Sequence, residues 1–387
     1  MTKTASRNLS LVPRCGPVVR ALLDWFAANA RDLPWRRTCD PYAIWISEIM
    51  LQQTQVATVI PYWRRWMRAL PTLESVAKAR PARLRKLWEG LGYYTRVRNL
   101  HRAARQILRR HRGQFPQIFD DILALPGVGR YTAGAIASIV FNQPKPILDG
   151  NVTRVLTRLF AIQSSPRGRS TNPRLWRQAE ELVREASSVT QPAPRITRRP
   201  ASPRHPKPTI ALLTAGPCSA LNQSLMELGA GICTPRNPRC EVCPLSKLCC
   251  ARRLGIVDRL LTGGERKRGE ARCLAAFLVT RRGHILARQR PDGVVNARFW
   301  ELPHVELPSA RQNLARCARN ALGIAPTSLA PLSVVAHHIT RCRFRVEVFE
   351  GKLLRPLPGA WWLSPSAVRN KAFTGMDRKI LRRLREP

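Results

Sequence analysis

The chain has 387 residues, enough for two or three domains with their own cores. Its 66 lysines and arginines outnumber 24 acidic residues, and the net charge of +42 predicts a polyanionic partner, with nucleic acid preferred over an anionic membrane surface. The sequence shows no transmembrane span and no secretory signal, and its eleven cysteines are an odd number spread along the chain, which argues against a membrane protein and a secreted disulfide framework.

The first predicted helix covers residues 18–28 and carries Val18, Leu22 and Phe26 on one face. A turn follows in which Trp35 stands beside Arg36. These two side chains either contact a base or belong to a helix-connecting loop with the indole in the core, and local sequence favours the loop.

Asp40 and Pro41 are typical of a helix N-terminus, and the helix that follows carries Glu48 among apolar neighbours. An exposed carboxylate is the ordinary interpretation. Surrounding apolar surface would instead raise the pKa of Glu48 and keep a proton available near neutral pH. The next residues, from Gln52 to Gln55, are uncharged and polar, which suits contact with base edges better than phosphate binding.

Two glycine turns follow. Residues 90–94 (GLGYY) place two aromatic rings at a turn in a basic neighbourhood, where they serve either as core plugs or as wedges in a base stack. Residues 125–129 (LPGVG) predict a tight turn between two helices, with Gly127 and Gly129 leaving backbone N–H groups for a DNA phosphate. A plain loop between core helices explains that pattern equally well. Asp149 comes twenty residues after Gly129 and could act on the sugar of the held strand.

Residues 187–226 contain no acidic side chain, and the part at 187–217 is rich in proline and arginine. That composition predicts a solvated, disordered insertion. Helical periodicity resumes near residue 221.

Four cysteines then lie close together, with six, two and five residues between them: Cys233, Cys240, Cys243 and Cys249. Such spacing predicts a metal site. Four thiolates suit either zinc or a [4Fe–4S] cluster, and spacing alone leaves both open.

A basic linker at 251–270 precedes a change of pattern. Residues 274–280, 285–287 and 344–349 predict strands, and 310–322 predicts an amphipathic helix. The sequence therefore predicts a second, α+β domain.

Five ordered motifs and the cysteine run resemble the adenine-specific mismatch DNA glycosylases (the MutY family) of the helix-hairpin-helix superfamily, over nearly the whole chain. The motifs are LPWR (33–36), SEIMLQQTQVATVIPY (47–62), GLGYYTRVRNLH (90–101), LPGVGRYTAGAI (125–136) and ILDGNVTRV (147–155). The resemblance implies an N-terminal extension (1–17), an all-α glycosylase domain (18–250) with a [4Fe–4S] cluster on the four cysteines, the linker, and a Nudix-like domain (271–387).

By the same resemblance the enzyme hydrolyses the N-glycosidic bond of a flipped-out adenine paired with 8-oxoguanine or guanine in double-stranded DNA. Glu48 would protonate adenine, Asp149 would stabilise the sugar cation, and Tyr131 and Asn151 would support both acids. Trp35, Arg36 and Gln223 match adenine-binding positions. Positions that contact the opposite base or wedge beside it match Gln53, Thr54 and Tyr93. We expect a monomeric enzyme on cytoplasmic, nucleoid-associated DNA, with no membrane partner.

The C-terminal domain resembles the family's 8-oxoguanine reader, but residues 310–322 lack the glutamates of Nudix hydrolases. Thr340 stands where many relatives carry a lesion-contacting serine, with a different neighbourhood. Two alternatives remain: an endonuclease III-like glycosylase/lyase, which needs a lysine where this chain has Tyr131, and a non-catalytic DNA-binding module, which needs neither Glu48 nor Asp149.

Overall fold

A computed structural model describes residues 13–166, 168, 170–189, 215–260, 269–307, 314–339, 342–353 and 361–383. The chain divides into two compact units, the first comprising Met1–Lys78 and Asn99–Gly264, the second Ala79–Arg98 and Glu265–Pro387. The break at Gly264 lies inside the predicted linker. Residues 79–98, predicted as part of the helical domain, group with the C-terminal unit. Most of the predicted insertion and N-terminal extension lie outside the described residues.

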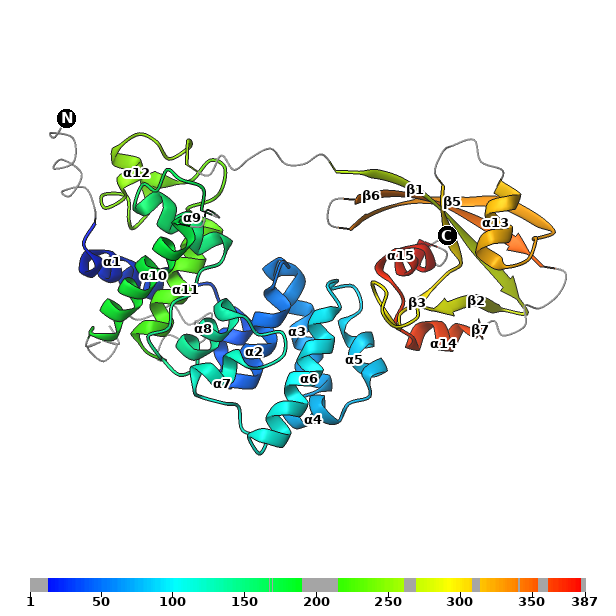
Figure 1. Cartoon of the computed structure of the whole chain (residues 1–387), viewed down its shortest axis with the longest axis horizontal. Coiled ribbons are helices and arrows are strands. Elements are labelled where there is room, and N and C mark those ends of the chain that lie inside the picture. Colours follow the sequence, from blue (N-terminus) through cyan, green and yellow to red (C-terminus); the bar gives the residue numbers. More distant parts are fainter. Residues whose placement is uncertain are drawn as a thin grey trace, which may run out of the picture. The chain divides into compact units, whose positions relative to one another are not determined.

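The first unit is helical (Figure 1). Its elements are α1 (Cys15–Asn29), η1 (Pro34–Arg37), α2 (Pro41–Leu51), α3 (Val56–Ala69), α4 (Leu73–Lys78), α6 (Thr95–Arg110, which begins in the second unit), α7 (Phe119–Leu123), α8 (Arg130–Ile139), α9 (Gly150–Leu159), α10 (Thr171–Ser187), α11 (Pro217–Gly231), η3 (Cys240–Val242) and α12 (Cys250–Arg253). The predicted first helix is confirmed and extends three residues further at its N-terminus. A core of aliphatic side chains joins α1, α8, α9, α10 and α11.

The second unit contains α5 (Pro81–Trp88) and a sheet with the strand order β3-β2-β1-β6-β5. The strands are β1 (Ala271–Arg281), β2 (His284–Gln289), β3 (Trp300–Glu301), β4 (His304–Leu307), β5 (Ser328–Ile339), β6 (Cys342–Lys352) and β7 (Trp361–Leu363). The helices are α13 (Leu314–Leu322), α14 (Pro365–Asn370) and α15 (Gly375–Arg383). The predicted strands are confirmed as parts of β1, β2 and β6.

Strand β1 is buried on both faces, which explains its continuous apolar sequence. Leu274, Ala276 and Leu278 pack with residues of α15, whereas Phe277 and Val279 pack with residues of α13. The period of two along a strand therefore divides one apolar run between two cores.

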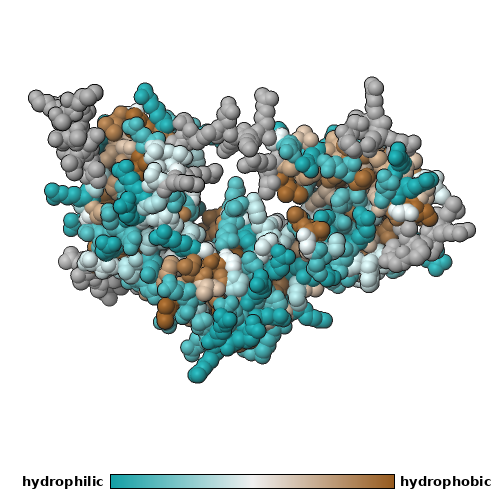
Figure 2. Space-filling model, viewed as in Figure 1, coloured by the Kyte–Doolittle hydropathy of each residue, from teal (hydrophilic) through white to brown (hydrophobic). Residues whose placement is uncertain are grey.

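Hydrophilic side chains cover most of the face drawn in Figure 2, as the charge of the chain leads one to expect. Among the described residues, no helix has both the length and the apolar character that crossing a bilayer requires.

Candidate active site

Helix α2 carries Glu48 to the wall of a cavity of about 560 Å³ in the first unit. Asp40 caps the helix as predicted, accepting a hydrogen bond from Tyr42 N at 3.0 Å, and Pro41 occupies the first turn. The helix is buried on every side from Tyr42 to Met50, so its carboxylate is buried as well, with 6% of Glu48 exposed.

The pKa of Glu48 is raised to about 7, chiefly by burial. The hydrogen bond from Tyr131 and the charge of Arg36 lower the pKa, and the charge of Asp149 raises it. The apolar environment predicted for this carboxylate is confirmed, since Ile46, Ile49 and Met50 are all buried. Near neutral pH, Glu48 therefore carries a proton that it can give away.

Tyr131, in the first turn of α8, donates to Glu48 Oε2 at 3.3 Å and lies 3.2 Å from Met226 Sδ. Burial and the two neighbouring carboxylates raise the pKa of Tyr131 well above its usual value. The phenol therefore remains neutral and acts as a donor to the carboxylate.

Asp149 lines the same cavity and is the N-cap of α9. Its Oδ1 accepts from Val152 N at 2.7 Å, and its Oδ2 accepts from Asn151 Nδ2 at 3.3 Å. Burial raises the pKa of Asp149, and these donors partly offset that effect by favouring the ionised form. The cavity thus contains two carboxylates in different environments, one favouring a proton and one hydrogen-bonded as an anion.

Trp35 and Arg36 lie in η1 and line the cavity. Trp35 is buried and packs edge to face with Trp63. Its indole therefore belongs to the core and also lines the cavity, so both interpretations of the sequence remain compatible with its position. Arg36 donates from Nε to Gln223 Oε1 at 2.9 Å and from Nη2 to Glu227 Oε2 at 3.0 Å.

Glu227 and Arg31 also line this cavity and were missed by the sequence reasoning. Glu227 pairs with both Arg31 and Arg36. Desolvation raises the pKa of Glu227, but hydrogen bonds and charges from the two arginines together outweigh it and lower the pKa below its usual value. One signal was available: Glu227 is the first acid after the acid-free stretch 187–226.

The remaining predicted DNA contacts lie in three places. Gln53 and Thr54 line the cavity after the end of α2. Tyr93 belongs to the second unit, with 47% of its surface exposed and a left-handed backbone at φ 46°. Gly127 and Gly129 form the turn between α7 and α8 as predicted: Gly127 has φ 80°, and a Cβ there would lie 2.7 Å from Asn99 Cβ, while Gly129 is the N-cap of α8. Thr340 lies outside the described residues.

Arg154 links the cavity to the cysteine segment. Its Nη2 donates to Asn151 Oδ1 and to Gly229 O, both at 2.7 Å, and its Nε donates to Cys233 O at 2.7 Å. The guanidinium therefore joins the start of α9, the end of α11 and the first cysteine of the run.

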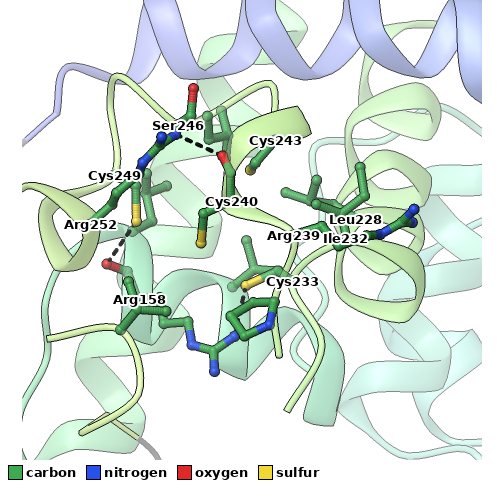
Figure 3. A pocket seen from close by; sticks show the side chains of 15 residues that line it. Arg158, Leu228, Ile232, Cys233, Arg239, Cys240, Cys243, Ser246, Cys249 and Arg252 are labelled. Atoms are coloured by element: carbon green, nitrogen blue, oxygen red, sulfur yellow. Dashed lines mark hydrogen bonds between the residues drawn. The ribbon is translucent and has the colours of Figure 1, made fainter. Parts of the chain in front are cut away.

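The four cysteines line a second, apolar cavity, and Figure 3 shows their sulfur atoms around one space. The buried Arg158 lies at its edge, donating to Cys233 Sγ at 3.4 Å and accepting from Cys249 Sγ on its own carbonyl oxygen at 3.4 Å. Arg252 also lines this space and donates to Cys240 O at 2.7 Å. Cationic side chains therefore surround the four ligands.

This arrangement fits an iron–sulfur cluster. The space between the four thiols is lined by apolar and cationic side chains. A zinc ion needs its four ligands at tetrahedral bonding distance, whereas a [4Fe–4S] cluster spaces four thiolates around a cube. A four-thiolate cluster is anionic, which the surrounding arginines favour.

Three family models match the chain. Residues 46–181 match the HhH-GPD superfamily base excision DNA repair protein, residues 233–249 match the iron-sulfur binding domain of endonuclease III, and residues 275–383 match the NUDIX domain. The first match contains Glu48, Tyr131 and Asp149, the second contains the cysteine run, and the third contains most of the sheet. The cofactor is therefore a [4Fe–4S] cluster in the segment 233–249, which contains Cys233, Cys240, Cys243 and Cys249.

Curated relatives cover nearly the whole chain. The human adenine DNA glycosylase is 32% identical over 94% of this chain and 73% of the relative, and the rat enzyme is 33% identical over 94% and 77%. The Arabidopsis thaliana adenine DNA glycosylase is 34% identical over 78% of this chain and 49% of the relative.

Proposed function

The chain belongs to the adenine DNA glycosylase family, and we propose that its substrate is adenine paired with 8-oxoguanine or guanine in double-stranded DNA. Members are base-excision-repair hydrolases that remove adenine without cutting the strand. The observation that carries the proposal is the cavity in which the protonated Glu48 meets Tyr131 and Asp149. A DNA-binding module would have no use for a buried carboxylate of raised pKa at its cavity wall.

Glu48 is the proposed general acid. An adenine flipped into the cavity leaves as a neutral base once N7 is protonated, and a carboxyl with a pKa near 7 supplies that proton at neutral pH. After adenine departs, the resulting carboxylate accepts a proton from the attacking water. Tyr131 stabilises that carboxylate by donating to it in either state.

Asp149 is the proposed stabiliser of the sugar cation. Breaking the glycosidic bond develops positive charge on the sugar, and a preorganised carboxylate lowers the energy of that state. Val152 N and Asn151 Nδ2 fix both carboxylate oxygens of Asp149, so the charge is positioned before the substrate arrives. Asn151 is in turn held by Arg154.

Trp35, Arg36 and Gln223 are the proposed adenine-binding residues, together with Glu227. The Trp35 indole offers an apolar face, and the Arg36–Gln223–Glu227 network contains both donors and acceptors of the kind found on adenine's edge. Arg36 is buried and donates from Nε, Nη1 and Nη2, so its network is in place before substrate enters.

Contacts to the duplex are proposed for two groups of residues. Gln53, Thr54 and Tyr93 contact the base opposite adenine or wedge beside it, which suits the exposed ring of Tyr93. Gly127 and Gly129, before the N-terminus of α8, bind a backbone phosphate. The charge of +42 adds sequence-independent attraction.

We assign recognition of 8-oxoguanine to the C-terminal domain, with Thr340 as the contact to its altered edge. Residues 310–322 contain no carboxylate, so this domain has no acidic metal-binding box for nucleotide hydrolysis. We propose that the active form is a monomer.

The test is a glycosylase assay on duplexes that contain adenine opposite 8-oxoguanine, adenine opposite guanine, or an oxidised pyrimidine. We expect excision from the first two, faster from the first, and none from the third. Excision of oxidised pyrimidines with strand cleavage would instead support the endonuclease III-like activity.

A further inference from the structure

The turn that carries Tyr93 is attached to the C-terminal domain through Glu89. Glu89 is the C-cap of α5 and directly precedes Gly90, the first residue of the turn at 90–94. Contacts that fix the Glu89 side chain therefore also fix the start of the turn. Only 11% of the Glu89 side chain is exposed. The contacts below all lie within the second unit, which contains residues 79–98 and 265–387.

Four donors converge on the Glu89 carboxylate. Oε1 accepts from Arg378 Nε at 3.0 Å, from Arg378 Nη2 at 2.6 Å and from Phe373 N at 2.6 Å, while Oε2 accepts from Lys86 Nζ at 2.9 Å. Two of these partners are distant from Glu89 in sequence: Arg378 lies on α15, and Phe373 lies just before that helix. A carboxylate so surrounded fixes its own position.

The partners of Glu89 are themselves fixed. Arg378 also donates to Lys371 O at 3.0 Å and lies over the Phe373 ring, which is fully buried. Lys86 donates to the same carbonyl oxygen at 3.0 Å. The C-terminal domain therefore provides a socket for the Glu89 carboxylate. Arg378 and the backbone N–H of Phe373 bind the carboxylate, and Lys371 O holds Arg378 and Lys86 in place.

A second contact lies at the far end of the turn. The Tyr94 ring packs against the buried ring of Phe299, with centroids 4.0 Å apart, and its hydroxyl accepts from Gly90 N at 3.3 Å. Both ends of the turn thus touch the C-terminal domain, and Tyr93 between them remains exposed.

The interior of the turn is equally constrained. Gly90, Gly92 and Tyr93 all have positive φ angles, of 100°, 72° and 46°. Trp88 Nε1 donates to Gly92 O at 3.2 Å, and Arg96 Nη2 donates to Leu91 O at 3.1 Å. A turn this rigid moves as one piece, so anchoring its ends determines where the Tyr93 ring stands.

We propose that Glu89 is a positioning residue that locks the Tyr93 turn to the domain that reads the base opposite adenine. This rests on the proposed function, in which Tyr93 wedges beside that base. The lock makes the wedge and the reader one unit, so the C-terminal domain influences the opposite strand through Tyr93 as well as through its own surface.

The test is a double-mutant cycle in the full chain, with Glu89→Gln, Arg378→Gln and both together. The first readout is hydrogen exchange of the amides of residues 90–96 without DNA, which we expect Glu89→Gln to speed by about tenfold or more. The second is the ratio of single-turnover excision rates on adenine opposite 8-oxoguanine and opposite guanine, which we expect to fall roughly tenfold, a usual size for coupling between sites. The double variant should match the worse single variant in both readouts, because each substitution already removes the contact between Glu89 and Arg378.

Asp377→Asn is the matched control. Asp377 precedes Arg378 in α15 and is fully buried, and its carboxylate accepts from Leu302 N at 3.0 Å and from Thr374 Oγ1 at 2.5 Å, within the C-terminal domain. We expect this variant to lower the melting temperature while leaving turn exchange and the excision ratio unchanged, and to add to Glu89→Gln rather than overlap with it.

Unchanged turn exchange in Glu89→Gln would overturn the lock, and so would faster exchange with an unchanged excision ratio in an enzyme that prefers 8-oxoguanine. If the proposed substrate is wrong, the wild-type enzyme will show no preference for adenine opposite 8-oxoguanine. In that case hydrogen exchange alone still decides whether Glu89 holds the turn.

Discussion

At the scale of single residues, the proposed general-acid role makes excision depend on the pKa of Glu48. A general acid acts while it is protonated, so excision should be retained below a pH of about 7 and lost as the pH rises through that value. Asp149 acts while it is ionised, and its pKa is raised, so the rate should also fall on the acidic side. We expect a bell-shaped profile in single-turnover excision, with its alkaline limb near pH 7.

Glu48→Gln tests the same assignment without changing pH. Glutamine keeps the shape and polarity but has no proton to give, so excision should fall by a factor on the order of 10² to 10⁴ while lesion-duplex binding survives. Asp149→Asn should also lose chemistry far more than binding, because the charge is needed chiefly in the transition state. Near-normal excision by Glu48→Gln would refute the general-acid role. The same conclusion would follow if the excision rate of this variant still fell as the pH rises through about 7.

The side chain at position 131 bears on whether the enzyme can also cut the strand as a lyase. Strand cleavage needs an amine that forms a Schiff base with the sugar, and the phenol of Tyr131 cannot supply one. Wild-type enzyme should leave an intact abasic strand until alkali is added. Tyr131→Lys places an amine beside Glu48 and should introduce some strand cleavage and a borohydride-trapped adduct. Stoichiometric trapping by the wild type would contradict this.

At the scale of elements, two buried arginines connect the cysteine segment to α9. Arg154 and Arg158, both on α9, contact Cys233, and Arg154 also contacts Asn151. Since Asp149 caps the same helix, the loop that holds the cluster and the start of α9 are parts of one hydrogen-bonded structure.

Purified protein should therefore contain iron and sulfide rather than zinc, be brown and absorb broadly in the visible range. Cys240→Ser removes one ligand and should lower cluster content, solubility and DNA binding together, because ligand binding and local folding are coupled. Cys218→Ser is the control, since Cys218 is buried away from this cavity and should leave iron content unchanged. Zinc without iron after anaerobic purification would overturn the assignment.

The sequence predicted those elements whose signals are local. The Asp40-Pro41 start of α2, the apolar surroundings of Glu48 and the Gly127 turn depend on residues within a few positions of one another, and the structure confirms them. Strand β5 was not predicted: Pro331 interrupts it, and its pairing with β6 shifts register between Pro331 and Ser333.

Contacts between distant residues could not be predicted. Arg31 and Glu227 are 196 positions apart, and Glu89 and Arg378 are 289 apart. In a chain with 66 basic side chains, the sequence does not say which one an acid will meet. For the same reason the grouping of residues 79–98 with the C-terminal domain became visible only in the fold.

At the scale of the whole molecule, the proposed roles assign the chemistry to the first unit and the reading of the lesion to the second. Glu48, Asp149 and the four cysteines belong to the first unit, whereas Tyr93, Glu89 and the C-terminal domain belong to the second. Nonspecific attraction comes from charge in both and should weaken steeply as salt increases.

Truncation after Gly264 tests this division. The shortened protein keeps Glu48, Asp149 and the cysteine segment, so it should still excise adenine opposite guanine. It loses Thr340 and also the socket that holds Glu89. A polar base contact contributes about 1–3 kcal/mol of discrimination, so the preference for 8-oxoguanine should fall by roughly tenfold to a hundredfold. Single-turnover rates on both duplexes give the ratio. Full-length Thr340→Ala and Glu89→Gln then separate the lost lesion contact from the lost anchor, since truncation removes both. Equal losses on the two substrates would mean that the C-terminal domain grips DNA without reading the lesion.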